Sequence, residues 1–113
     1  MKFELPFLPP SVNTAYYTDF KSGTRHKSKK YREFKKDLEA FLPKGEVKGE
    51  IQVEYNFYMP DKRRRDVANY EKVLTDCLVS YGVIEEDSLI QRMVLEKYFD
   101  KGMPATVIQI TKI

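Results

Sequence analysis

The chain has 113 residues, 42% of them hydrophobic, which predicts one domain with a small core that spans residues 1–113. It contains no apolar run long enough for a transmembrane helix or a signal peptide, and its one cysteine excludes an intramolecular disulfide, so we expect a cytoplasmic protein with no membrane partner. The net charge is only +3, but twelve of the 20 basic residues are concentrated in residues 21–36 and 62–65, which is typical of nucleic-acid-binding proteins.

The first predicted element is a short strand at residues 2–8, where apolar and polar residues alternate and Pro6 confines the strand to the edge or end of a sheet. A polar, aromatic loop follows, in which Tyr16 and Tyr17 either stack on DNA bases or pack on the core. Residues 18–27 are rich in Lys, Ser, Gly and Thr, and they predict a mobile basic loop that becomes ordered on DNA.

Residues 28–42 predict an amphipathic helix that is capped by Ser28. Its apolar stripe, which we expect to face the core, comprises Tyr31, Phe34, Leu38, Phe41 and Leu42. Its other surface is basic and either follows a DNA backbone or keeps the protein in solution. The candidates for backbone contact in this region are Lys27, Lys29 and Lys30.

Residues 50–59 alternate in polarity along their whole length and predict a half-buried strand. A second amphipathic helix is predicted from Val67 to Tyr81, where apolar residues recur at helical spacing before Gly82 ends the pattern. Asp66 stands at the N-cap of this helix, where the free N–H groups and the positive helix end favour a carboxylate.

A second, polar stripe runs along this predicted helix, directly after four consecutive cations. The stripe consists of Asp66, Asn69, Lys72 and Asp76. Their spacings of three and four place them near one side of the helix. Carboxylates hold Mg²⁺ and cations hold phosphate, which is the mixture that phosphodiester chemistry requires, whereas the alternative is an ordinary solvated helix face. The candidate DNA contacts in this segment are Lys62, Arg63, Arg64, Arg65 and Asn69.

Three adjacent acids at residues 85–87 follow the second helix, and they either bind a cation or cap the turn before the next strand. Residues 89–99 and 106–113 predict two strands that are joined by a hairpin turn at residues 100–102. The order of the elements predicts an α+β fold, in which a small mixed sheet of about four strands packs with two helices.

One longer pattern runs through these segments. It comprises Met59 to Asp66, then Asn69, Lys72, Asp76 and Gly82, then Glu86-Asp87, and near the start Leu5-Pro6, Pro9-Pro10-Ser11, Asn13, Tyr16-Tyr17, Thr24 and His26. This pattern resembles the RusA family of Holliday-junction resolvases. The resemblance implies a homodimeric, Mg²⁺-dependent endonuclease, with Mn²⁺ as a substitute metal and no small-molecule cofactor. Its implied substrate is a four-way DNA junction, which it resolves by paired symmetric nicks during recombination and repair in a bacterial or phage-infected cell.

The resemblance also implies roles for individual residues. Asp66, Lys72 and Asp87 are the expected catalytic residues, and Asp66, Glu86 and Asp87 are the expected metal ligands. One position differs, because Ala68 stands where the family commonly has a second catalytic aspartate.

The absence of that aspartate leaves several explanations open. Glu71, Asp76 or Glu86 compensates for it, the protein cuts weakly, or the alanine was introduced to trap a complex. A junction-binding protein with weak or no cleavage is therefore the first alternative function. A nuclease of another lineage, built on Pro60-Asp61, is the second alternative, although this dipeptide is common.

Overall fold

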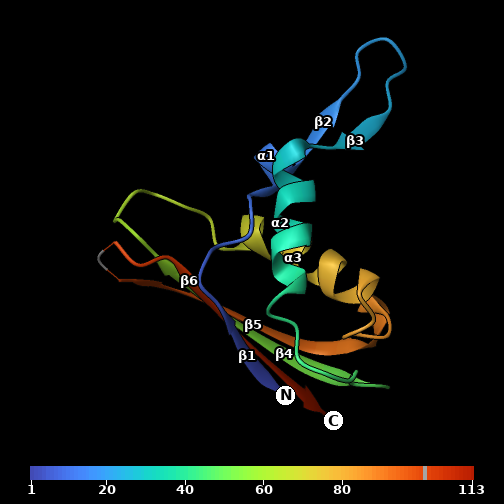
Figure 1. The fold of residues 1–113 in the computed structure, drawn as a ribbon, viewed down its shortest axis with the longest axis vertical. Helices are drawn as coiled ribbons and strands as arrows, with labels where there is room; N and C mark the ends of the chain where they lie inside the picture. The colour runs from blue at the N-terminus through green and yellow to red at the C-terminus, as the bar shows by residue number, and fades with distance from the viewer. Residues whose placement is uncertain (101) are drawn as a thin grey trace.

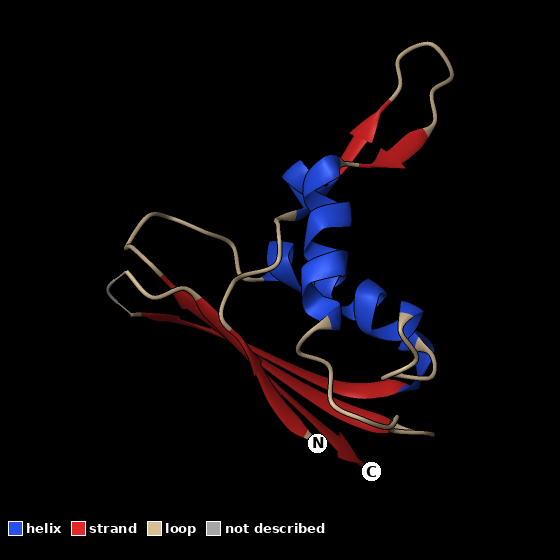
Figure 2. Ribbon diagram, viewed as in Figure 1, coloured by secondary structure: helices blue, strands red, loops and turns tan. Residues whose placement is uncertain are grey.

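The computed structural model describes residues 1–100 and 102–113, and it places helices on one face of a four-stranded mixed sheet (Figure 1, Figure 2). The helices are α1 (Val12–Ala15), α2 (Lys29–Glu39) and α3 (Ala68–Ser80), and a 3₁₀ turn, η1, spans Asp87–Leu89. The strands of the sheet are β1 (Lys2–Leu5), β4 (Ile51–Met59), β5 (Ile90–Phe99) and β6 (Ala105–Lys112), while β2 (Tyr16–Thr18) and β3 (Arg25–Lys27) form a separate hairpin. The predicted α+β class and four-stranded mixed sheet are confirmed, and α1 is a third helix that the sequence pattern did not predict.

The main sheet has the strand order β1-β6-β4-β5. β4 and β5 are parallel and are connected through α3, whereas β6 is antiparallel to both β1 and β4. The predicted hairpin turn at residues 100–102 is therefore wrong, because β5 and β6 do not pair in the described part of the chain; Lys101 itself lies outside the described residues. The position of β6 inside the sheet buries Ile108 and Ile110 fully, which a place on the outer edge of β5 would not achieve.

The core lies between the sheet and the helices. β4 alternates strictly between buried and half-buried residues, as its sequence predicts, and its buried side chains pack toward α2 and α3. The two longer helices contribute Tyr31, Phe34 and Leu38 from α2 and Val73, Leu74, Cys77 and Leu78 from α3. Because α2 ends at Glu39 rather than at residue 42, Phe41 is left exposed. Within the described ranges, every helix is too short or too polar to cross a bilayer.

The ends of the helices follow most of the predicted capping signals. The Ser28 hydroxyl accepts the Tyr31 N–H at 3.3 Å, so the predicted cap of α2 is confirmed. α3 ends at Ser80, and Gly82, which follows its C-cap Tyr81, has a φ of 78° that allows the tight reversal of the chain. The helix begins at Ala68, one residue later than predicted, and its N-cap is Val67, so the predicted N-cap at Asp66 is wrong. The Asp66 carboxylate still accepts the Ala68 N–H at 3.1 Å, just before the helix.

The predicted mobile loop at residues 18–27 is instead largely a β-hairpin. Tyr16 pairs with Lys27 and Thr18 pairs with Arg25, and a turn spans residues 19–24. The hairpin projects from the helical end of the molecule, away from the main sheet (Figure 1). Aromatic and β-branched residues at 16–18 favour a strand, and Gly23, with a φ of 71°, permits the turn.

Candidate active site

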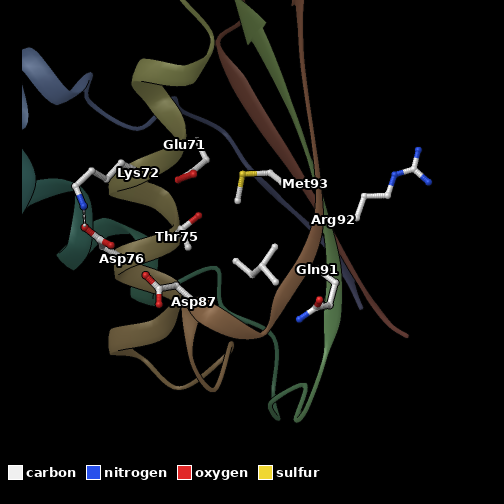
Figure 3. Close-up of a pocket in the computed structure, with 9 residues that line it drawn as sticks. Glu71, Lys72, Thr75, Asp76, Asp87, Gln91, Arg92 and Met93 are labelled. Atoms are coloured by element: carbon white, nitrogen blue, oxygen red, sulfur yellow. Dashed lines mark ion pairs between the residues drawn. The ribbon is translucent and has the colours of Figure 1, made fainter.

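Two adjoining cavities lie along α3 and form the candidate active site. The first has a volume of about 460 Å³ and lies between α3 and the start of β5 (Figure 3). The second has a volume of about 550 Å³ and lies between α3, α2 and the β2–β3 hairpin. Three charged side chains line both cavities: Lys72, Asp76 and Asp87. Lys72 and Asp76, which form the second half of the predicted polar stripe, therefore line the site.

Asp87 is placed at the site because the chain reverses directly after α3. Gly82 ends the helix, and the N–H of Val83, which is buried, is bonded to the Leu78 carbonyl at 2.9 Å. This closure returns the chain along the helix, so that η1 begins at Asp87 beside the Asp76 turn of α3 (Figure 3). Residues 85–87 were predicted either to bind a cation or to cap the turn before the next strand. Asp87 does begin the 3₁₀ turn before β5. Cation binding stays a prediction.

Asp76 is the centre of a polar contact that joins α3 to the hairpin. Its Oδ2 lies 3.4 Å from the Lys72 Nζ and accepts a hydrogen bond from the Tyr16 hydroxyl at 3.0 Å. Burial, followed by the hydrogen bond to Asp76, raises the pKa of Tyr16 to about 12, so this hydroxyl remains a donor at neutral pH. The contact fixes the base of the hairpin against the helix that carries the site.

Glu71 is a further carboxyl group in the first cavity. Burial raises its pKa above the usual range, and the negative charges of Asp76 and Asp87 raise it further. The neighbouring Thr75 is buried, and its hydroxyl lies 2.9 Å from that of Tyr55 in the core. A carboxyl group that is partly desolvated and lines a cavity with two others binds a proton more readily than usual. That Glu71, Asp76 or Glu86 compensates for Ala68 stays a prediction.

The second cavity also contains cations that come from the hairpin. The Arg25 guanidinium lies 4.5 Å from the centroid of the Tyr16 ring, and the Lys27 Nζ lies 5.0 Å from that of the Tyr31 ring. The rings hold these charges at the rim of the cavity that Asp87 also lines. Cations restrained in this way suit an anionic ligand such as a phosphate group.

The basic run at residues 62–65 divides into two parts. Arg65 makes two hydrogen bonds to the Asp61 carboxylate, at 2.7 and 3.1 Å, and its side chain is only 11% exposed. These bonds lower the pKa of Asp61 to about 2. The backbone of Arg65 is held as well, because Lys97 donates to its carbonyl at 2.6 Å. Arg65 therefore stabilises the turn before α3, and its guanidinium is already occupied by a carboxylate. The exposed cations of the run are Lys62, Arg63 and Arg64.

Several predicted residues lie outside the two cavities. Asp66 and Asn69 are at the start of α3 and line neither of them, whereas Glu86 lines the second. Within residues 1–100 and 102–113, no three His, Cys, Asp or Glu side chains are grouped so that they could hold one metal ion. A metal site shared by Asp66 and Asp87 therefore stays a prediction.

The remaining predicted DNA contacts lie on the hairpin and on α2. Tyr17 is exposed and stacks on His26, with a distance of 5.4 Å between the ring centroids. Lys29 and Lys30 are exposed in the first turn of α2. Their contact with a DNA backbone stays a prediction.

Three further residues line the cavities that were not predicted as site residues from the sequence: Arg25, Tyr31 and Thr75. Tyr31 and Thr75 were not distinguishable from ordinary helix residues, because their place at the cavities depends on packing between elements. Arg25 could have been found from the sequence. It and Tyr16 lie in two short segments that flank a glycine-containing turn, which is a pattern typical of a β-hairpin.

Comparison with known proteins gives two kinds of match. The sequence model of a family described as "Endodeoxyribonuclease RusA" matches residues 6–111. "Crossover junction endodeoxyribonuclease RusA" of Aquifex aeolicus (strain VF5) is 36% identical over 61 residues, which cover 54% of this chain and 48% of that protein. "Crossover junction endodeoxyribonuclease rusA" of Enterobacteria phage HK97 is 31% identical over 90 residues, which cover 76% of this chain and 72% of that protein. The match thus spans about half the length of the Aquifex relative.

Proposed function

Because the chain belongs to the RusA family of endodeoxyribonucleases, we propose that it binds four-way DNA junctions and resolves them by paired, symmetric nicks. The name shared by both relatives, crossover junction endodeoxyribonuclease, supports this substrate and reaction. The proposal is carried by the convergence of Lys72, Asp76 and Asp87 between two cavities, one of which is also lined by Arg25 and Lys27. Carboxylates and cations that face one open cavity match the needs of phosphodiester hydrolysis.

Each charged side chain has a distinct role in this proposal. Arg25 and Lys27 hold phosphates of the bound strand and guide it past the second cavity. Lys72 donates to the reacting phosphate and stabilises the negative charge that develops on it. Asp76 forms an ion pair with Lys72 and accepts a hydrogen bond from Tyr16, and it so keeps the ammonium group oriented.

We further propose that the reaction uses Mg²⁺, for which Mn²⁺ can substitute. The acids of the region supply the oxygen donors that these cations prefer, but within the described residues one chain does not group three of them, and Ala68 contributes none. The expected ligands Asp66, Glu86 and Asp87 do not surround one point in the described residues. Glu86 and Asp87, which both line the second cavity, would hold the ion weakly, with water and DNA phosphate oxygens as further ligands. A bound ion would supply charge stabilisation at the phosphate and activation of water.

The proposed active form is a homodimer. A four-way junction has approximate two-fold symmetry, and its resolution requires two nicks that are related by that symmetry. A two-fold dimer presents two copies of the cavity pair in this arrangement. Sedimentation of the free protein and of its complex with one junction tests the proposed stoichiometry of two chains to one DNA.

A cleavage assay on a synthetic four-way junction tests the function. We expect paired nicks that require Mg²⁺ or Mn²⁺, and much slower cutting of a linear duplex of the same sequence. Lys72→Ala is the matched control and should reduce the rate by roughly 10²–10³-fold, as does the loss of one group that stabilises a transition state. Equal cutting of the duplex, or metal-independent nicks, would contradict the proposal.

A junction-binding protein with weak or no cleavage is the second candidate, and Ala68 is the observation that favours it. This candidate predicts tight junction binding without nicks at any Mg²⁺ concentration. The other alternative, a nuclease of a different lineage built on Asp61, loses support because the chain belongs to this family and the Asp61 carboxylate is occupied by Arg65.

A further inference from the structure

The turn at the end of the β2–β3 hairpin is an ordered structure. The Asp19 N–H donates to the Thr24 carbonyl at 2.9 Å, and the Gly23 N–H donates to the Asp19 carbonyl at 2.7 Å. The Asp19 carboxylate also accepts the Lys21 N–H at 2.9 Å. These bonds fix the backbone on both sides of the residue between Asp19 and Lys21.

That residue is Phe20, whose side chain is 99% exposed. Single exposed apolar residues are common on protein surfaces and need no special explanation. Phe20 differs because it lies on an element that projects from the body of the protein and is fixed by its own hydrogen bonds (Figure 1). The backbone that carries the phenyl ring is therefore held in place, and the ring itself is open to a partner.

The base of the same hairpin is joined to the candidate active site. Tyr16 donates to Asp76, and Arg25 and Lys27 line the cavity that Lys72 also lines. Phe20 lies four residues beyond Tyr16, so at about 3.3 Å per residue it is at most roughly 13 Å from the base of the hairpin. This distance corresponds to at most about four base-pair steps along a duplex axis, at about 3.4 Å per step.

We infer that Phe20 inserts between bases at the branch point of the DNA whose backbone passes the active-site cavity. This inference rests on the proposed function, because it takes branched DNA as the substrate. An aromatic ring stacks on any base, so it needs no particular sequence. Bases at a branch point are more easily opened than those inside a duplex, because pairing and stacking are interrupted there. Lys21, Arg25 and Lys27 on the same hairpin would hold the flanking phosphates.

The alternative contact for a two-stranded ribbon is the major groove of an intact duplex arm, which is wide enough to admit it. In that position Phe20 would touch base edges and would not stack between bases. The two contacts therefore predict different results for a reporter at position 20. They also predict different effects of Phe20→Ala on junction and duplex affinity.

The chain contains no tryptophan, so Phe20→Trp introduces a single indole reporter. Met103→Trp is the matched control, since Met103 is also an exposed apolar residue, at 66%, outside the hairpin. Both variants are titrated with a four-way junction and a linear duplex in the presence of a chelator, so that binding is measured without cleavage. We expect strong quenching of the indole at position 20 by the junction, weak quenching by the duplex, and no quenching at position 103.

Affinity provides the second measurement. Phe20→Ala should weaken junction binding by about tenfold, within the range known for the loss of one base-stacking aromatic residue, and should leave duplex binding unchanged. Phe20→Tyr should restore the affinity. Equal losses on junction and duplex would overturn base insertion in favour of groove binding, and unchanged affinity together with absent quenching would overturn any role in DNA contact.

A duplex with an unpaired internal bubble separates this inference from the proposed function. If the wild type shows no preference for junctions over duplexes, the proposed function fails. The bubble still offers unstacked bases. Quenching at position 20 by the bubble would therefore support base stacking by Phe20, and no quenching would overturn it. Because Phe20 is fully exposed, the variants should unfold at the same temperature as the wild type, which circular dichroism checks.

Discussion

The two halves of the polar stripe on α3 use their charges differently. At the start of the helix, Asp66 is exposed and accepts the Ala68 N–H, in a turn where Arg65 is already paired with Asp61. In the middle of the helix, Lys72 and Asp76 contact each other and also face two cavities. Both places combine carboxylates with cations, but only the second is enclosed by α2, the hairpin and the chain that follows α3.

This comparison shows that a dense run of charge does not by itself locate a binding site. Arg65 belongs to the strongest basic run in the sequence, yet its side chain is 11% exposed and stabilises a turn. The cations at the candidate site, Arg25 and Lys27, come from the hairpin, a segment of weaker sequence signal. What distinguishes them is that tertiary contacts hold them beside Lys72.

Cleavage should be affected most by replacing one carboxylate at the cavities and one near the start of α3. Asp87→Asn should abolish cleavage while junction binding is retained or tightened, because the substitution removes a negative charge near phosphate. We expect the same of Asp66→Asn, although Asp66 lies outside both cavities. Nicking rates with Mg²⁺ and gel-shift affinities without it measure the two properties separately.

Each outcome of that experiment bears on the comparison. Normal cleavage by Asp66→Asn would confine catalysis to the middle of α3 and would contradict the predicted role of Asp66. Loss of junction binding by a folded Asp87→Asn would contradict its assignment as a catalytic residue.

The next effect concerns the salt dependence of binding. Replacing Arg63 and Arg64 with glutamine should flatten the slope of log affinity against log salt by roughly two units, about one for each phosphate that an arginine no longer neutralises. Arg65→Gln is the matched control and should leave the slope unchanged, because Asp61 occupies its guanidinium. A change of slope in Arg65→Gln would show that the ion pair opens on DNA, and an unchanged slope in the double variant would assign Arg63 and Arg64 to the fold or the dimer.

A smaller gain is expected from restoring a carboxylate at the first residue of α3. Ala68 is exposed next to Asp66, so Ala68→Asp should tighten Mg²⁺ binding and raise cleavage at low Mg²⁺ by about tenfold, the lower end of what groups around a metal contribute. The fold should not suffer, because the positive helix end favours an acid there by roughly 0.3–1 kcal/mol. Titration of Mg²⁺ against the nicking rate measures the change.

If the alanine form already cuts equally fast at low Mg²⁺, another residue supplies the missing ligand. Glu71 is then the first to test, since it lines a cavity together with Asp87. Glu71→Gln in the protein with Ala68 should in that case abolish cleavage. Glu85→Gln, which changes an exposed acid two residues before Asp87, should not.

The smallest effect concerns stability and pH. Hydrogen bonds from Arg65 lower the pKa of Asp61 from 3.8 to about 2, so the pair stabilises the folded state above pH 3.8 and loses this contribution as the pH falls toward 2. Arg65→Gln should lower the melting temperature slightly at neutral pH, since the pair is partly exposed, and should unfold at the same temperature as the wild type near pH 2. A difference between the two proteins that persists at pH 2 would assign another role to Arg65.

Elements with a local signal could be predicted from the sequence alone. The strict alternation of residues 50–59 predicts β4, the apolar spacing and Gly82 predict α3, and the Ser28 signal predicts the start of α2. The pattern from Met59 to Asp87 was also sufficient to identify the family, because motif residues are fixed by chemistry and spacing along the chain.

Which of these residues come into contact depends on how the elements pack together. The position of β6 between β1 and β4 could not be predicted from the short connection after β5, because strand order depends on which apolar residues become buried together. The hydrogen bond from Tyr16 to Asp76 could not be predicted either, because the two residues are 60 positions apart in the sequence. Local patterns reflect the conformational preferences of neighbouring residues, whereas a site built from a hairpin, a helix and the turn that follows it depends on packing between distant segments.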